Sequence, residues 1–80
     1  MSEEEKYRKV FMESLGLSDG QLDELTYQSV PEWDSVGHMN LIAAIEDAFD
    51  IIMDAEDILE FSSFEKGKEI LSSSSYGVDF

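Results

Sequence analysis

The 80-residue sequence predicts an all-α domain of four helices, with a long loop between the first two helices and a short third helix. Three observations support this fold class. Apolar residues recur at helical spacing near the N-terminus, Asp34 is a good N-cap before a long apolar-rich run, and Ser62 with Glu65 forms a capping box before the last run. We expect residues 1–72 to form one domain and residues 73–80 to be a disordered C-terminal tail.

The first helix is predicted from an acidic start and an apolar stripe. Glu3 to Glu5 suit the positive end of a helix dipole, and Gly16 suits the C-terminal end of the helix. Between them, apolar residues recur at helical spacing: Tyr7, Val10, Phe11 and Leu15. Such a stripe is typical of a face that packs in a core, so we interpret this helix as scaffold.

Residues 17–33 are predicted to form a long loop, with a short helical turn between Asp19 and Leu25. Turn-forming residues are mixed with scattered apolar residues in this segment. A connection of this length is uncommon in so small a domain and is often functional or tightly packed. Trp33, at its end, fits either a core position or a contact with a partner.

The central helix should begin at Ser35 or Val36, because the Asp34 carboxylate can accept hydrogen bonds from first-turn N–H groups. Ser35 would then lie at the positive end of the helix dipole, where a phosphate ester is stabilised. At about 100° per residue, the apolar residues fall on two sides of the helix. The larger set should face the core: Leu41, Ile42, Ile45, Ala48 and Phe49. The smaller set lies close to Ser35 and suggests a partner: Val36, Met39 and Ala43, with Asn40, Glu46 and Asp47 on or beside it.

Two shorter helices should follow. The third is predicted from about Ala55 to Glu60, and the fourth follows the capping box. Gly67 should weaken the fourth helix by about 1 kcal/mol relative to alanine. Four apolar residues are candidates for contacts around the third helix: Ile52, Met53, Ile58 and Phe61. For Met53 and Ile58, an adaptable contact and core filling remain equally open.

The run Asp34-Ser35-Val36 at a helix start, followed by a helix ending in Glu-Asp-Ala-Phe-Asp, resembles the Asp-Ser-Leu signature and second helix of acyl carrier proteins. The resemblance covers roughly the whole chain apart from both ends. It implies a four-helix bundle of acyl carrier protein type, in which leucines of the long loop tuck under the first two helices. It also implies that 4′-phosphopantetheine is attached to Ser35, next to Asp34, and carries an acyl or related group as a thioester.

The resemblance implies a carrier that works with enzymes and is not itself one. A phosphopantetheinyl transferase would move the arm from coenzyme A to Ser35 with magnesium, and acyl-loading, condensing and modifying enzymes would dock through basic patches. The partner-binding residues would be Val36, Met39, Asn40, Ala43, Glu46, Asp47, Met53 and Ile58. Gly37, His38 and Asn40 depart from the pattern common in fatty acid carriers. Fatty acid, polyketide and other specialised pathways therefore stay open, and no residue names the cargo.

Charge narrows the kinds of partner. The chain has 19 acidic and 5 basic residues and a formal net charge of −14, with no Lys or Arg between Val10 and Glu65. Nucleic acids and anionic membranes would be repelled, whereas basic protein surfaces would be attracted. There is no cysteine for a disulfide or a cysteine-based zinc site. No signal-peptide pattern or membrane-spanning run is present, so we expect a cytoplasmic protein. We also expect it to be a monomer.

Three other functions fit parts of the sequence. A hydrolase could use Ser35 and His38 as nucleophile and base, but there is no second histidine and no Gly-x-Ser-x-Gly elbow. Residues 54–65 have the length of a calcium-binding loop, but Ile58 and Leu59 stand where an oxygen ligand and the turn glycine belong. A non-carrier acidic helical interaction module is the main alternative, since it explains the acidic apolar patch.

Overall fold

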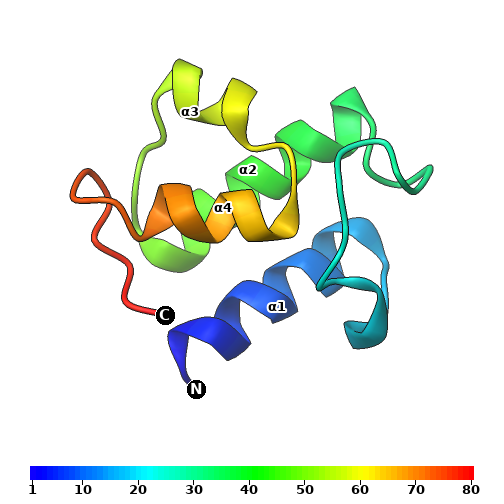
Figure 1. The fold of residues 1–80 in the computed structure, drawn as a ribbon, viewed down its shortest axis with the longest axis horizontal. Coiled ribbons are helices and arrows are strands. Elements are labelled where there is room, and N and C mark those ends of the chain that lie inside the picture. Colours follow the sequence, from blue (N-terminus) through cyan, green and yellow to red (C-terminus); the bar gives the residue numbers. More distant parts are fainter.

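The computed structural model describes all 80 residues, which form four α-helices and no strand (Figure 1). The elements are α1 (Glu3–Leu15), a 3₁₀ turn (Asp19–Gln21), α2 (Ser35–Phe49), α3 (Ala55–Glu60) and α4 (Phe64–Leu71). The predicted all-α class, the long loop before α2 and the short third helix are confirmed. No helix combines the length and the apolar character needed to cross a membrane.

The helix ends follow from their capping residues. Gly16, in the left-handed conformation with φ of 68°, ends α1 as expected. The cap of α4 differs by one residue from the prediction, because Ser63 and not Ser62 accepts a hydrogen bond from the Lys66 N–H, at 2.9 Å. Ser62 is instead held by the loop, since its carbonyl oxygen accepts from the Tyr27 N–H at 2.8 Å. Pairing with the loop therefore sets where α4 begins.

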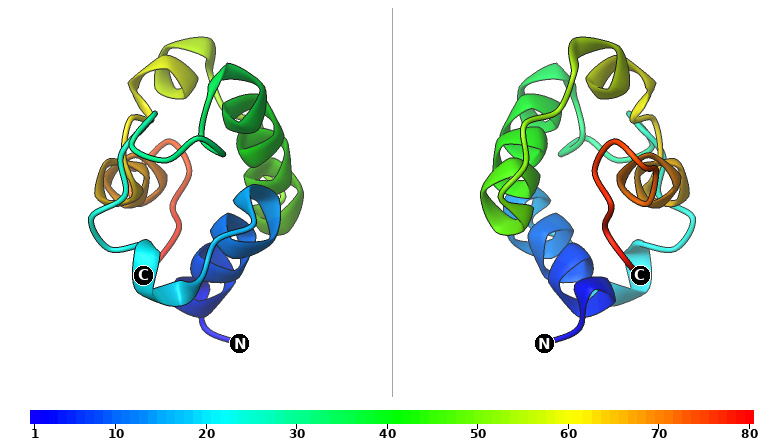
Figure 2. Two further views of the ribbon diagram at one scale, coloured as in Figure 1. Left: turned by 90° about the vertical axis from the view of Figure 1, so that its right-hand side faces the viewer. Right: turned by 90° about the vertical axis from the view of Figure 1, so that its left-hand side faces the viewer.

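The helices enclose one core. Helices α1 and α2 pack against each other, and α4 lies across the core from them (Figures 1 and 2). The short α3 lies at the opposite end of the bundle from α1, above α2 and α4 in these views (Figures 1 and 2). The radius of gyration is 11.4 Å, close to the roughly 12 Å expected for a compact domain of this length.

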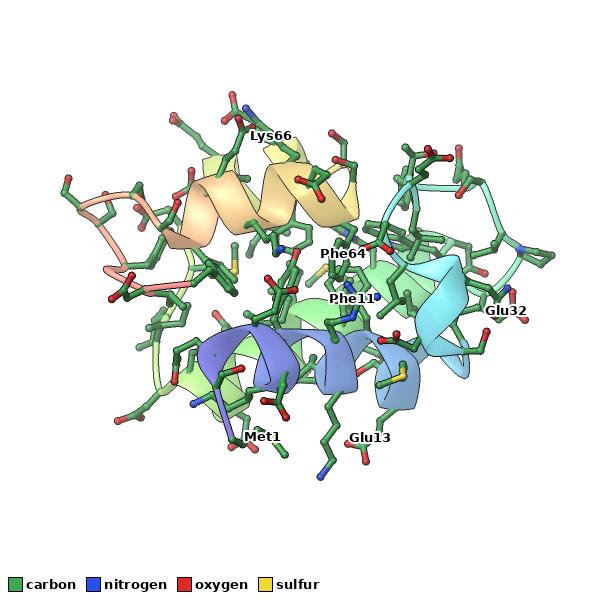
Figure 3. All side chains as sticks on the ribbon, turned by 60° about the horizontal axis from the view of Figure 1, so that its bottom comes forward. Met1, Phe11, Glu13, Glu32, Phe64 and Lys66 are labelled. Carbon is green, nitrogen blue, oxygen red and sulfur yellow. The ribbon has the colours of Figure 1, made fainter.

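Aromatic rings fill the space between α1 and α4. Phe11 and Phe64 point toward each other from the two helices (Figure 3), with ring centroids 5.0 Å apart. Tyr7 packs on both rings, and its hydroxyl donates a 2.7 Å hydrogen bond to the Phe64 carbonyl oxygen. All three side chains are fully buried. The long loop adds buried leucines, as predicted: Leu17, Leu22 and Leu25.

The C-terminal segment, residues 73–80, differs from the disordered tail that its composition suggests. Gly77, with φ of 66°, turns the chain back, so that the Val78 N–H donates to the Leu71 carbonyl oxygen at 2.9 Å. Val78 is only 8% exposed, and the Phe80 ring packs on Tyr7 with centroids 5.1 Å apart. Apolar side chains at alternate positions after the turn hold this segment against the bundle.

Candidate functional site

Ser35 is the first residue of α2 and is exposed. The Asp34 carboxylate caps the helix by accepting the Gly37 N–H at 2.8 Å, so the predicted helix start is confirmed. A helix start leaves first-turn N–H groups without intrahelical partners. Because Ser35 is exposed at the start of a 15-residue helix, its hydroxyl is accessible at the positive end of the helix dipole.

Gly37 has a steric reason to be glycine. A Cβ atom added at this position would overlap the backbone carbonyl oxygen of Glu32, in the loop before α2. The last turn of the loop therefore packs directly on the first turn of the helix. The glycine that departs from the pattern of fatty acid carriers is needed by this close approach, which fixes the helix start that presents Ser35.

An exposed apolar patch with an acidic rim follows Ser35 along α2. The Val36 side chain is 68% exposed and the Met39 side chain 55% exposed. The other predicted partner residues on this face are also exposed: Asn40, Ala43 and Asp47. Large apolar side chains left in water near one point are typical of a contact surface.

The other three predicted partner residues serve the fold. Met53 is only 5% exposed and belongs to the core, so its expected partner contact is corrected to core filling. Glu46 is half-buried, and its carboxylate accepts the Met53 N–H at 2.9 Å. Ile58 is half-buried and packs against the core from α3. The sequence pattern left the roles of Met53 and Ile58 open and missed that of Glu46, because all three depend on how the chain after α2 folds back.

His38 links the loop to α3. Trp33 is fully buried and is therefore a core residue, and its indole Nε1–H donates to His38 Nδ1 at 2.9 Å. His38 Nε2 lies 2.8 Å from the Ile58 carbonyl oxygen. Because the indole nitrogen can only donate, Nδ1 must accept, so Nε2 carries the proton and donates to Ile58. Both ring nitrogens are thus engaged, which leaves neither to act as a base toward Ser35.

A pocket of about 150 Å³ opens beside this histidine. Its walls are mainly apolar and come from the loop, α2 and the segment around α3: Tyr27, His38, Ile58, Leu59, Phe61 and Ser62. His38 lies three residues after Ser35, so the two are neighbours on the surface of α2. The residue pattern alone does not show this lining, because the pocket is assembled from segments far apart in the chain.

The cations lie away from this site. All five belong to α1 or α4. Arg8 donates hydrogen bonds to Asp19 at 2.6 Å and to Asp23 at 2.8 Å, and its guanidinium group lowers the pKa of the Asp23 carboxyl. Lys68 pairs with Glu4 at 2.5 Å. The exposed face of α2 therefore carries acids with no cation among them, and no cluster of three or more side chains could hold a metal ion.

No protein-family model, no curated protein and no solved structure matches this chain.

Proposed function

We propose that the chain is a carrier protein of the acyl carrier type, with Ser35 as the acceptor of 4′-phosphopantetheine. One observation carries the proposal: an exposed serine at the first position of a capped helix stands directly beside the exposed Val36 and Met39. A modifying enzyme needs access to the hydroxyl and a surface to hold. Here the Ser35 hydroxyl and the apolar surface of Val36 and Met39 lie within about one helical turn of each other.

The modification would be a group transfer from coenzyme A. The Ser35 Oγ forms a bond to the phosphorus that bears pantetheine, the diphosphate bond of coenzyme A breaks, and adenosine 3′,5′-bisphosphate leaves. The serine proton passes to the leaving group or to water. When attached, the arm would supply the thiol that a chain without cysteine lacks, so that an acyl group can be held as a thioester.

The residues around Ser35 fit such a phosphodiester. Free N–H groups and the dipole at a helix start favour an anion by about 0.3–1 kcal/mol. The Asp34 carboxylate is engaged with the Gly37 N–H, and Gly37 adds no side chain beside the serine. The pocket beside α3 would shelter a small apolar part of the cargo, and the cargo itself stays open among fatty acid, polyketide and other specialised pathways.

Docking would combine apolar and acidic contacts. Val36, Met39 and Ala43 would provide the shallow apolar contact, and Asp34 with Asp47 would pair with Lys or Arg of a transferase or of acyl-loading, condensing and modifying enzymes. Contacts of this kind give fast, salt-dependent encounter. A carrier needs weak contacts of this kind, because it has to leave each enzyme after transfer.

The test is an intact-mass measurement after incubation with coenzyme A, magnesium and a broad-specificity phosphopantetheinyl transferase. We expect a gain of one phosphopantetheine unit, absent in Ser35→Ala and retained in Ser74→Ala, a control at an exposed serine of the C-terminal segment. An unmodified wild-type chain would exclude the carrier function. The remaining candidate would be a non-carrier acidic interaction module, which the same exposed patch supports.

A second experiment tests docking by charge. Asp47→Lys should slow modification at low salt, because it puts a cation on the proposed docking face. Glu13→Lys changes the net charge equally at an exposed position on α1 and is the matched control. Equal rates for the two variants would contradict the docking face, even if Ser35 is modified.

A further inference from the structure

Helix α3 has little apolar attachment of its own. None of its six residues is fully buried, and Leu59 is 83% exposed. The residues on either side are anchored, since Met53 and Phe61 are 5% and 1% exposed. An isolated helix of this length is unstable in water, so interactions with other elements must hold α3 in its place.

The first interaction is at the start of α3 and comes from the C-terminal segment. The Tyr76 hydroxyl accepts the Asp54 N–H at 2.9 Å and donates to the Asp57 carboxylate at 2.5 Å. Asp54 is the N-cap of α3, and its side chain makes no capping hydrogen bond. In a capping box, the side chain at the third helical position reaches back to the N-cap N–H directly. Asp57 holds that position with a side chain one methylene shorter than Glu, and the Tyr76 hydroxyl lies between the two groups.

Tyr76 is itself held firmly. The Gly77 N–H donates to the Ser73 carbonyl oxygen at 2.7 Å, and the buried Val78 follows directly. Phe80 packs on Tyr7 and on Phe49, with ring centroids 5.1 and 6.3 Å apart. Burial and then the hydrogen bond to Asp57 raise the pKa of Tyr76, so its hydroxyl remains a donor throughout the neutral range. The C-terminal segment thus joins α3 to the core.

The second interaction is near the end of α3. His38 Nε2–H donates to the Ile58 carbonyl oxygen at 2.8 Å, from the helix that carries Ser35. The His38 ring and Ile58 both line the apolar pocket. Movement of α3 away from α2 would therefore break this hydrogen bond and widen the pocket.

We propose that residues 73–80 act as a strap on α3: the Tyr76 hydroxyl completes the cap at the first turn of the helix, the His38 hydrogen bond holds its last turn, and together they limit how far this wall of the apolar pocket can move. Releasing Tyr76 frees the first turn of α3, and releasing His38 frees its last turn. The Tyr76 hydroxyl bonds can break while Val78 and Phe80 stay packed on the core, so α3 would be released without unfolding the bundle. This inference does not depend on whether Ser35 is modified.

The test measures amide hydrogen exchange by NMR in the full-length chain. Tyr76→Phe removes only the bridging oxygen, and a hydrogen bond has a net value of about 0.5–1.5 kcal/mol, so exchange in Ala55–Glu60 should accelerate about 2- to 12-fold. Exchange in the α1 core should stay unchanged. Tyr27→Phe, at a tyrosine that lines the pocket, is the matched control and should leave α3 unaffected.

A compensating variant separates the bridge from general loss of packing. In Tyr76→Phe with Asp57→Glu, the longer carboxylate can reach the Asp54 N–H directly and form an ordinary capping box. Protection of α3 should then return toward the wild-type level. Wild-type exchange in Tyr76→Phe, equal acceleration in α1 and α3, or no recovery with Asp57→Glu would each overturn the proposal.

Discussion

Two regions of this small bundle are held by opposite kinds of interaction. Between α1 and α4, Tyr7, Phe11 and Phe64 are fully buried and pack ring against ring. At α3, no side chain is fully buried, and hydrogen bonds from His38 and Tyr76 fix the position of the helix. Exposing buried apolar side chains to water costs free energy that no new contact returns. A partly exposed hydrogen bond, by contrast, can be exchanged for a hydrogen bond to water at little net cost. The bundle therefore joins a rigid half, α1 with α4, to a half around α3 that we propose can open.

The largest expected effect breaks the rigid half. Phe11→Ala should lower the free energy of unfolding by about 3–5 kcal/mol, because it leaves a cavity among buried rings. Leu59→Ala, at an exposed apolar residue of α3, should cost less than about 0.5 kcal/mol. Urea titration followed by Trp33 fluorescence measures both. Similar losses for the two variants would show that α3 contributes to the core as much as α1 does.

The second prediction concerns Gly67, where steric fit and helix propensity predict opposite effects of an alanine on stability. Gly67 is in the interior of α4, where propensity alone predicts that alanine stabilises by about 1 kcal/mol. A Cβ atom there would overlap the Phe61 ring and the Tyr7 hydroxyl, so we expect Gly67→Ala to destabilise by about 1–3 kcal/mol. Gly20→Ala, with nothing within 4 Å of the added atom, is the control. A more stable Gly67→Ala chain in thermal unfolding would refute the close packing.

The third effect depends on pH. Burial and then the charges of Glu65 and Glu4 raise the pKa of Tyr7 far above its ordinary value of 10.0. The protonated form is favoured in the folded state, so this stability is complete below about pH 10 and is lost as pH rises further. The slope is at most about 1.4 kcal/mol per pH unit for this one group. Urea titrations at pH 9, 10 and 11 should show this fall in the free energy of unfolding with pH. The fall per pH unit should be smaller in Tyr7→Phe than in Tyr27→Phe.

The smallest effect is spectroscopic and concerns the half that can open. The chain has one histidine and one tryptophan, so both rings can be assigned without ambiguity. Nitrogen-15 NMR at neutral pH should find His38 protonated on Nε2 and unprotonated on Nδ1, where it accepts from Trp33. The opposite tautomer would mean that the Ile58 carbonyl oxygen has no donor and that α3 lacks its second hydrogen bond.

Much of the fold could be predicted because its signals are local. The N-cap at Asp34, the glycine end of α1 and the apolar spacing of α1 and α2 each depend on neighbours within about two helical turns. The predicted Ser62–Glu65 capping box does not form, because the loop N–H of Tyr27 takes the Ser62 carbonyl oxygen and the N-cap is Ser63, one residue later. The exposure of Ser35, Val36 and Met39 also followed from periodicity, since a helix with one face in the core leaves the opposite face in water.

By itself, the sequence determined the helices, the exposed serine at a helix start and the uneven distribution of charge, because these depend on spacing and composition. Only the tertiary structure decided that Trp33 and Met53 are core residues, that Gly67 is a steric requirement and that residues 73–80 pack on the bundle. It also decided the links from His38 and Tyr76 to α3. The physical reason is that these contacts join separate elements of the chain, as His38 joins Ile58 and Tyr76 joins Asp54, so their energy appears only when the chain closes on itself.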